Sequence, residues 1–206
     1  MPYTFELIRK ADQATSNWSG GTTTQIAIFP KNSVYAERNF TWRISSALVE
    51  LEQSEFTPLP GIWRLIMVID GEMRLEHTGH HTTYLKPFDQ DSFSGNWTTT
   101  SFGKVRDFNV MLAKGSIGKL SATSLDPQES TSAAIYNLDS KQFSQMTSAF
   151  YCIDGAVTID IANDTYKLNT GDMLLITSSE PLNPHSITIT NNANELSHIV
   201  QSDIYY

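Results

Sequence analysis

The sequence predicts an all-β protein built from two fused lobes of similar design, and three observations support this prediction. Most apolar stretches are short, alternate with polar residues and end at Gly, Asn, Asp or Pro, as half-buried strands do. Helical periodicity is nearly absent over the 206 residues, apart from a weak candidate at Leu138–Met146. Two blocks of sequence, one in each half, share the same order of turns and apolar positions. Many short strands without intervening helices form sandwiches or barrels.

The strand candidates follow one another along most of the chain, separated by turn-forming residues. In order they are Thr23–Phe29, Trp42–Leu51, Arg64–Ile69, Glu72–His77, Val105–Ala113, Ala149–Ile153, Ala156–Ile161, Met173–Thr177 and Ser186–Ile189.

An internal repeat relates the two halves. Val68–Gly71 and Cys152–Gly155 both end in Asp-Gly, and each is followed by apolar residues at the same two offsets. Asp-Gly between alternating segments predicts a hairpin, because glycine accepts the positive φ of a tight turn. Each block then reaches an aspartate at a matched position, Asp89 or Asp172. We therefore expect a duplicated β-structure.

The repeat predicts the division of the chain into lobes. We expect a first lobe at residues 1–115, a connector at 116–134 that is rich in Ser and Thr and holds a Pro, and a second lobe at 135–206. Charge separates these parts as well. The whole chain carries 14 basic and 22 acidic residues, a net charge of −8. Residues 1–115 have a net charge of −1 and residues 116–206 a net charge of −7.

All arginines and all tryptophans precede residue 107, so we expect ligand chemistry in the first lobe.

The acidic balance argues against a nucleic-acid partner, whose phosphates need a basic surface. The longest strongly apolar run, Leu65–Ile69, is far shorter than the ~20 residues of a membrane-spanning helix. Met1–Asp12 also lacks the pattern of an export signal. We expect a cytoplasmic protein without a membrane partner.

Polar residues lie among apolar neighbours on three of the expected strands. Because side chains two apart on a strand share a face, Arg43 and Ser45 lie together, as do Asp107 and Asn109. Arg64 shares its face with apolar residues of its own strand. If these faces point into one barrel, the cluster has one excess positive charge and suits a small anionic or amide-bearing molecule. The alternative is a structural Arg–Asp pair with the second arginine facing outward.

The Asp-Gly turn, the strand after it and the turn at Gly171-Asp172 resemble the cupin barrel. Metal-binding cupins place an H-x-H pair, a Glu and a further His on adjacent strands, so that the ligands converge on one ion. Here no H-x-H pair lies on a strand, and we expect His77, His80 and His81 to point outward from a turn. We therefore expect no metal and no cofactor. A G-x-S-x-G nucleophile motif is absent as well.

Ordered motifs along the chain resemble those of the HutD/Ves family. They are Trp18–Thr22, Arg43–Ser45, Phe56 with Pro60-Gly61 and Arg64, Gly71, Phe88–Asp91 and Asp107–Met111. The resemblance covers roughly residues 3–190, with Gln90 in place of the glycine expected before the last aspartate of its motif. It implies a bicupin, in which two RmlC-like β-barrel or jelly-roll lobes are fused in one bacterial chain. HutD members are linked with histidine utilisation and with binding of an intermediate such as formylglutamate, and Ves members with stress responses.

Together, residues and resemblance predict a metal-free, non-catalytic bicupin that binds a small acidic metabolite. Its predicted ligand-binding residues are Arg43, Ser45, Arg64, Asp107 and Asn109, with Trp18 and Thr22 as lid or wall residues. One alternative is a metal-free cupin enzyme, an isomerase or hydrolase of a small amide or sugar derivative, with Asp107 as its acid/base. Another is a purely structural or protein-interaction role for the acidic second half. Because a bicupin already pairs its own lobes, we favour a monomer over a dimer.

Overall fold

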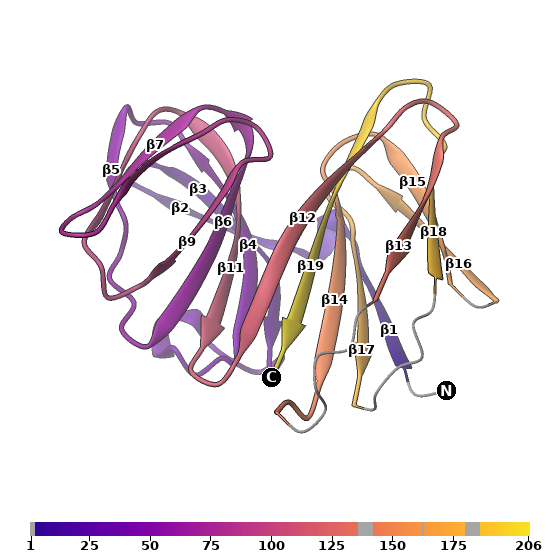
Figure 1. Ribbon diagram of the computed structural model, residues 1–206, viewed down its shortest axis with the longest axis horizontal. Coiled ribbons are helices and arrows are strands. Elements are labelled where there is room, and N and C mark those ends of the chain that lie inside the picture. The colour runs from indigo at the N-terminus through magenta and orange to yellow at the C-terminus, as the bar shows by residue number, and fades with distance from the viewer. Residues whose placement is uncertain (1–2, 136–141, 162, 180–185) are drawn as a thin grey trace. The chain divides into compact units, whose positions relative to one another are not determined.

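The computed structural model describes residues 3–135, 142–161, 163–179 and 186–206, and most of them lie in β-strands (Figure 1). Within these ranges the only helices are two short 3₁₀ turns, at Lys10–Asp12 and Tyr35–Glu37. The all-β prediction is confirmed. Of the helical candidate Leu138–Met146, residues 138–141 lie outside the described ranges, and Met146 begins a strand. No described helix is long and apolar enough to cross a membrane.

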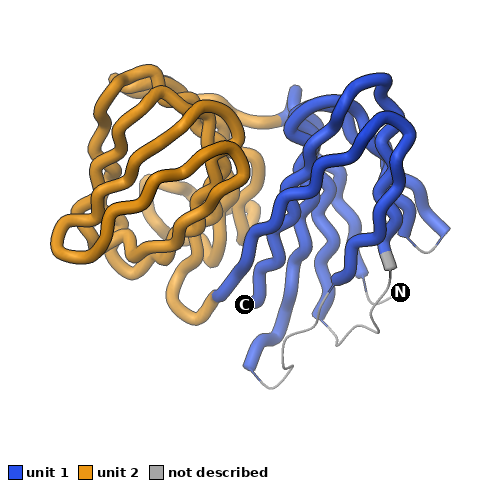
Figure 2. Tube along the Cα trace, turned by 45° about the horizontal axis from the view of Figure 1, so that its top comes forward, with its two compact units in different colours: residues 1–12, 117–206 blue, residues 13–116 orange. Residues whose placement is uncertain are grey.

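The chain divides into two compact units, coloured separately in Figure 2. Unit 2 comprises residues 13–116, and unit 1 comprises residues 1–12 and 117–206. This division differs from the predicted lobes at both ends. The first strand, β1 (Tyr3–Ile8), pairs with β17 (Met173–Ser178) of unit 1. The expected connector contributes β12 (Ile117–Leu125), which pairs with β19 (Ser197–Tyr205) in the same unit.

Side-chain contacts explain why the N-terminus belongs to unit 1. The Arg9 Nη1 atom donates to Asp172 Oδ2 at 2.7 Å, and the backbone N–H of Lys10 donates to Asp172 Oδ1 at 2.9 Å. Asp172 is 4% exposed. Burial alone would raise the Asp172 pKa, but the hydrogen bonds from Asn169, Lys10 and Arg9 outweigh burial and lower it. This buried carboxylate thereby ties the N-terminal segment to a turn more than 150 residues away along the chain.

Unit 2 is a jelly roll of two antiparallel sheets. One has the strand order β2-β3-β4-β11-β6-β9, and the other has the order β5-β10-β7-β8. The strands are β2 (Ala14–Trp18), β3 (Gly21–Phe29), β4 (Trp42–Val49), β5 (Gln53–Glu55), β6 (Ile62–Gly71), β7 (Met73–His77), β8 (Thr82–Leu85), β9 (Gln90–Ser94), β10 (Thr99–Phe102) and β11 (Val105–Ala113).

Unit 1 repeats this topology. Its sheets have the orders β1-β17-β14-β19-β12 and β13-β18-β15-β16, so that β12 to β19 correspond one by one to β4 to β11. The remaining strands are β13 (Ser130–Ala134), β14 (Met146–Cys152), β15 (Ala156–Ile161), β16 (Asp164–Asn169) and β18 (Ser186–Asn191). The units differ in what is added to this frame: β2 and β3 extend unit 2 beside β4, whereas β1 extends unit 1 beside β17. The predicted duplicated fold is confirmed.

The Asp-Gly turns are not hairpins, and this part of the prediction is wrong. Strand β6 pairs with β9 and β11, whereas β7 pairs with β8 and β10, so Gly71 carries the chain from one sheet to the other. Gly71 has a φ of +81°, and Gly155 has a φ of +72°. A Cβ on Gly71 would lie 2.5 Å from the carbonyl oxygen of Lys104. The corner therefore needs glycine, although the strands beside it do not pair with each other.

The aspartate turns after the repeat match each other in detail. Phe88 has a φ of +73° and Gly171 a φ of +88°, so Phe88 takes the left-handed conformation that glycine takes in unit 1. The carboxylate of Asp89 accepts the N–H of Lys86, as that of Asp172 accepts the N–H of Asn169, both at 3.0 Å. Gln90, where the family resemblance led us to expect glycine, is simply the first residue of β9.

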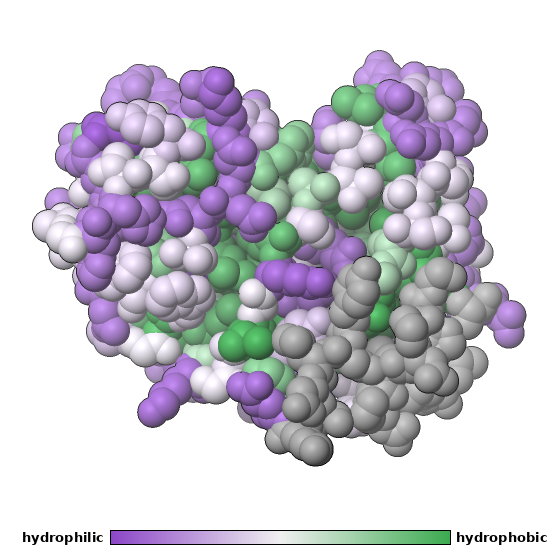
Figure 3. All heavy atoms as spheres, in the orientation of Figure 1, coloured by the Kyte–Doolittle hydropathy of each residue, from purple (hydrophilic) through white to green (hydrophobic). Residues whose placement is uncertain are grey.

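The two sheets of unit 2 enclose an apolar core. It comprises Val49, Ile66, Val68, Met73, Leu75, Leu85, Phe93 and Val105, with Phe56 and Trp97 packed against it. Each such side chain contributes roughly 1.5–3 kcal/mol when fully buried. On the face shown in Figure 3, hydrophilic residues make up much of the visible surface of unit 2, with apolar residues exposed among them. The site described below shares the core-facing side of the larger sheet.

Candidate functional site

The strand register places the polar residues of β4, β11 and β6 side by side. Arg43 and Arg64 flank Met111, and each is the direct cross-strand partner of that residue. In the next row on the same face Asn109 pairs with Ser45, and in the third row Asp107 pairs with Ala47. Directly opposite residues of an antiparallel pair point to the same face. The alternation of three strands thereby gathers two guanidiniums, a carboxylate, an amide and a hydroxyl.

These side chains border a cavity of about 280 Å³ within unit 2. The lining residues are Ser16, Trp18, Thr23, Tyr35, Arg43, Ser45, Ala47, Val49, Ser54, Glu55, Phe56, Thr57, Arg64, Asp107, Asn109 and Met111. The wall mixes apolar and aromatic side chains with polar ones, and its buried charges lie on the sheet formed by β4, β11 and β6, whereas the exposed Glu55 lines it from β5. Such a combination is typical of small-molecule sites.

Arg43 is held in place by its neighbours. Its Nε atom donates to Gln25 Oε1 at 2.8 Å, and its Nη1 atom donates to Ser45 Oγ at 3.0 Å. The guanidinium carbon lies 4.3 Å from the centre of the Tyr35 ring. Burial lowers the Arg43 pKa, and the Tyr35 phenol partly offsets this effect. These contacts fix one end of the guanidinium and leave its Nη2 atom without a hydrogen bond to any described residue.

Arg64 is buried without any polar partner among the described residues. It is 8% exposed, and its Nε atom makes no hydrogen bond. Its guanidinium carbon instead lies 4.5 Å from the centre of the Phe56 ring and 5.3 Å from that of Phe93. Burial lowers the Arg64 pKa to about 10, while the negative charge of Asp107 raises it. This arginine is positioned by aromatic rings, and its hydrogen-bonding capacity is unused.

Asp107 is the buried carboxylate of the cavity, whose lining also includes the exposed Glu55. It is 4% exposed, and its Oδ1 atom accepts only the backbone N–H of Ala47, at 3.4 Å. Burial raises its pKa to about 6, while the charge of Arg64 lowers it. No ion pair within 4.0 Å joins Asp107 to Arg43 or Arg64 in the described structure, so the structural Arg–Asp pair considered above does not form. Asn109 is equally unsatisfied, because its buried Oδ1 atom has no hydrogen-bond partner.

A sequence profile of the HutD family matches residues 10–195 of this chain. The chain belongs to the HutD family. No curated protein matches the sequence.

Solved structures show the same fold over nearly the whole HutD-family chain. The conserved protein of unknown function PA5104 from Pseudomonas aeruginosa PAO1 is 22% identical with a TM-score of 0.79, over 98% of both chains. HutD from Pseudomonas fluorescens SBW25 (formate condition) is 20% identical with a TM-score of 0.65, over 97% of this chain and 98% of that one. The bacterial pirin YhhW from Escherichia coli, solved in complex with nickel(II), is 13% identical with a TM-score of 0.66, over 96% and 98%. At these identities the likeness shows the bicupin fold alone.

Six of the seven predicted site residues of this HutD-family chain line the cavity, and Thr22 does not. Thr23 lines it instead, since neighbouring residues of β3 point to opposite faces. Sequence reasoning missed Tyr35, which comes from a 3₁₀ turn and so has no strand alternation to reveal it. It also missed Gln25, the polar partner of Arg43.

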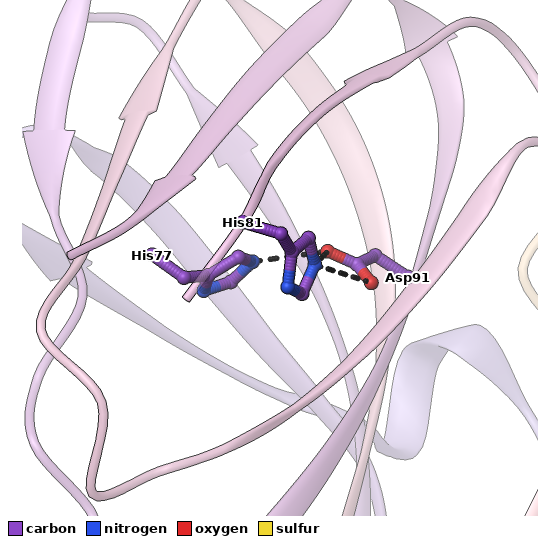
Figure 4. A group of neighbouring side chains, drawn as sticks. All are labelled: His77, His81 and Asp91. Atoms are coloured by element: carbon purple, nitrogen blue, oxygen red, sulfur yellow. Dashed lines mark hydrogen bonds and ion pairs between the residues drawn. The ribbon is translucent and has the colours of Figure 1, made fainter. Parts of the chain in front are cut away.

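The histidines near the β7–β8 turn do not all point outward, and this expectation is wrong. The His77 side chain is completely buried, because it lies on the inward face of β7 with Met73 and Leu75. Its Nε2 atom lies 2.9 Å from Asp91 Oδ2, and the Nε2 atom of the half-exposed His81 lies 3.1 Å from the same oxygen (Figure 4). None of these three residues lines the cavity.

Proposed function

We propose that this HutD-family protein binds a small acidic metabolite in the cavity of unit 2, with the charge of the site supplied by its arginines. The observation that carries the proposal is Arg64, a buried guanidinium that faces the cavity without a hydrogen bond or ion pair among the described residues. Burying an unpaired charge is costly, so a protein retains one chiefly where a ligand completes it.

A carboxylate on the ligand would supply the hydrogen-bond acceptors that Arg64 lacks. The planar guanidinium matches a carboxylate with two parallel hydrogen bonds, each contributing roughly 1.5–3 kcal/mol. Arg43 and Arg64 flank one residue of β11, so their charges face the cavity from adjacent positions. On the core-facing side of the larger sheet, two guanidiniums and the carboxylate of Asp107 leave one excess positive charge, while the exposed Glu55 lines the cavity from β5 of the other sheet. A dicarboxylate suits the site better than a monocarboxylate because it offers one carboxylate to each arginine.

Asn109 narrows the ligand class further. Its buried Oδ1 atom lacks a donor, so a ligand that carries an N–H group satisfies it. The Phe56 and Tyr35 rings and the Met111 side chain offer apolar contact for a short hydrocarbon chain. An N-acylated acidic amino acid has all of these features in a volume that the cavity admits. N-formyl-L-glutamate is the example that the family's link with histidine utilisation suggests.

Calorimetric titration with a graded set of ligands tests this assignment. We expect one N-formyl-L-glutamate to bind per chain, with glutarate weaker because it lacks the N–H group. N-formylglycine should be weaker still because it has a single carboxylate, and formamide should not bind. If none of these acids gives a heat of binding or a rise in melting temperature at millimolar concentration, the proposal is wrong.

A second candidate function is catalysis by Asp107. Burial raises its pKa to about 6, close to the value at which a carboxyl group both accepts and donates protons efficiently at neutral pH. This observation favours a metal-free isomerase or hydrolase acting on the same acidic, amide-bearing class of molecule. The Asp107 variant considered in the Discussion separates the two functions.

A further inference from the structure

A second cluster of functional side chains lies in unit 2 outside the cavity. It comprises His77 at the end of β7, His81 in the turn before β8 and Asp91 on β9. One ligand atom from each residue, an imidazole nitrogen or a carboxylate oxygen, lies within 4.8 Å of the other two. Figure 4 shows both imidazoles directed toward the carboxylate. None of these three residues lines the cavity that contains Arg64.

The distances within the cluster suit a single metal ion. Neighbouring ligands at about 2.0–2.1 Å from zinc lie roughly 2.8–3.0 Å apart in an octahedral shell and roughly 3.3–3.4 Å apart in a tetrahedral one. The Nε2 atoms of His77 and His81 lie 2.9 Å and 3.1 Å from Asp91 Oδ2. The two rings are 4.6 Å apart between centroids and tilted by 44°. Two imidazoles and one carboxylate are the donor set of borderline divalent ions, with remaining positions open to water.

The groups behind the cluster are also arranged as in metal sites. The Nδ1 atom of His77 lies 2.8 Å from the hydroxyl of the buried Thr99. When Nδ1 carries the proton and donates to Thr99, Nε2 keeps its lone pair for a metal. Outer partners of this kind fix the tautomer and the ring orientation of ligating histidines. The hydrogen bond to Thr99 can therefore hold the His77 ring with its Nε2 atom directed at the metal position.

Exposure differs between the ligands in a way that permits exchange. The His77 side chain is fully buried, that of Asp91 is 13% exposed and that of His81 is 43% exposed. An ion can therefore enter from the side of His81 and reach a nitrogen that is already fixed. Trp97 borders the cluster, with its ring centroid 5.6 Å from that of His77 and 5.9 Å from that of His81.

We propose that His77, His81 and Asp91 form a binding site for one zinc-class divalent metal ion that fastens the β7–β8 turn to β9. The ion has a structural role in unit 2, apart from the ligand cavity. The Phe93 ring contacts both sites. Its centroid lies 4.5 Å from that of the His77 ring and 5.3 Å from the guanidinium carbon of Arg64. The proposal is independent of which metabolite the cavity binds.

Titration of the chelator-treated full chain with Zn²⁺ and with Co²⁺ tests the site. We expect one ion per chain in calorimetry, a rise in melting temperature and a cobalt absorption spectrum that indicates nitrogen ligands. His81→Ala should weaken binding more than about tenfold without unfolding the protein, because His81 lies in an exposed turn. Thr99→Val, which removes only the partner of His77, should weaken it by about 10–100-fold.

His80→Ala is the matched control. His80 is in the same turn but stacks on Trp97, with ring centroids 3.8 Å apart. It should leave the metal affinity unchanged. Two results would overturn the proposal: no binding of either ion by the wild-type chain at millimolar concentration, or equal binding by wild type, His81→Ala and Asp91→Asn. The second result would place the metal elsewhere on the chain.

Discussion

Replacing Arg64 by methionine is expected to weaken binding of N-formyl-L-glutamate by about 100-fold. The change removes two charge-assisted hydrogen bonds, and each 1.4 kcal/mol corresponds to about a tenfold change in affinity. The same variant should be at least as stable as wild type without ligand, because it removes an unpaired buried charge and keeps an unbranched side chain against Phe56 and Phe93. Calorimetry and thermal unfolding measure the two effects separately.

Arg74→Met provides the control for this experiment. Arg74 is in the same unit, stacks on Phe102 with its guanidinium carbon 3.9 Å from the ring centre, and pairs with Glu76 outside the cavity. Its replacement should leave ligand affinity unchanged. If Arg64→Met binds the ligand as wild type does, Arg64 is a structural residue and the assignment of the cavity fails.

Ligand affinity is expected to rise as the pH falls from about 8 to about 5, and Asp107→Asn is expected to remove this dependence. A bound anion disfavours the charged form of Asp107 and raises its pKa further, so ligand binding takes up a proton. A ligand that raises the Asp107 pKa by about one binds about tenfold more tightly once Asp107 is protonated. The asparagine variant is neutral at every pH and should bind at about pH 8 as wild type binds at about pH 5.

The stability of the ligand-free protein depends on Asp107 in the same direction. Because folding raises its pKa from 3.8 to about 6, its contribution to stability is fully present below pH 3.8. That contribution is lost as the pH rises through about 6. Asp70→Asn is the control, since Asp70 is exposed on β6 and lies outside the cavity. An Asp107→Asn profile identical to wild type would show that another group sets the pH dependence.

The Asp107 variant also separates binding from catalysis. If Asp107 catalyses a reaction that uses no metal, Asp107→Asn should retain the acidic ligand but lose its conversion to product. Chromatography of wild type incubated with N-formyl-L-glutamate detects any turnover. If the ligand is recovered unchanged from wild type, the binding function stands and the catalytic one fails for this molecule.

Strand alternation was enough to predict the polar residues that β4, β6 and β11 contribute to the cavity, but not the rest of its wall. Arg43 and Ser45 on β4, like Asp107 and Asn109 on β11, share a face because side chains alternate with a period of two. The apolar residues on the same side of each strand indicate that this face points into the core. Tyr35 could not be predicted in this way, because it approaches Arg43 from a 3₁₀ turn in a long connection between β3 and β4.

Pairing between strands was harder to predict than their existence. Asp-Gly at residues 70–71 has the composition of a hairpin turn, yet the chain crosses there to the other sheet, where β7 pairs with β8 and β10. The same limit hid the placement of β1, whose partner strand lies more than 150 residues away. Long-range pairing depends on the whole jelly roll and leaves no local pattern in the sequence.

The histidine cluster could not be predicted from the sequence for the same reason, because its residues meet only through long-range pairing and packing. His77 ends the alternation of Met73 and Leu75 and is therefore inward-facing, which the sequence could have shown. Its partner Asp91 belongs to a strand that pairs with β6, so the convergence of the two depends on the packing of the two sheets. Spacing along the chain does not reveal such a site.

The most direct test of the acidic-ligand cavity is a crystal structure of the protein grown with N-formyl-L-glutamate. We expect ligand density in the cavity of unit 2, with a carboxylate within hydrogen-bonding distance of the Arg64 guanidinium and an N–H group facing Asn109 Oδ1. A cavity filled only by water at saturating ligand, or a ligand bound away from Arg43 and Arg64, would contradict it.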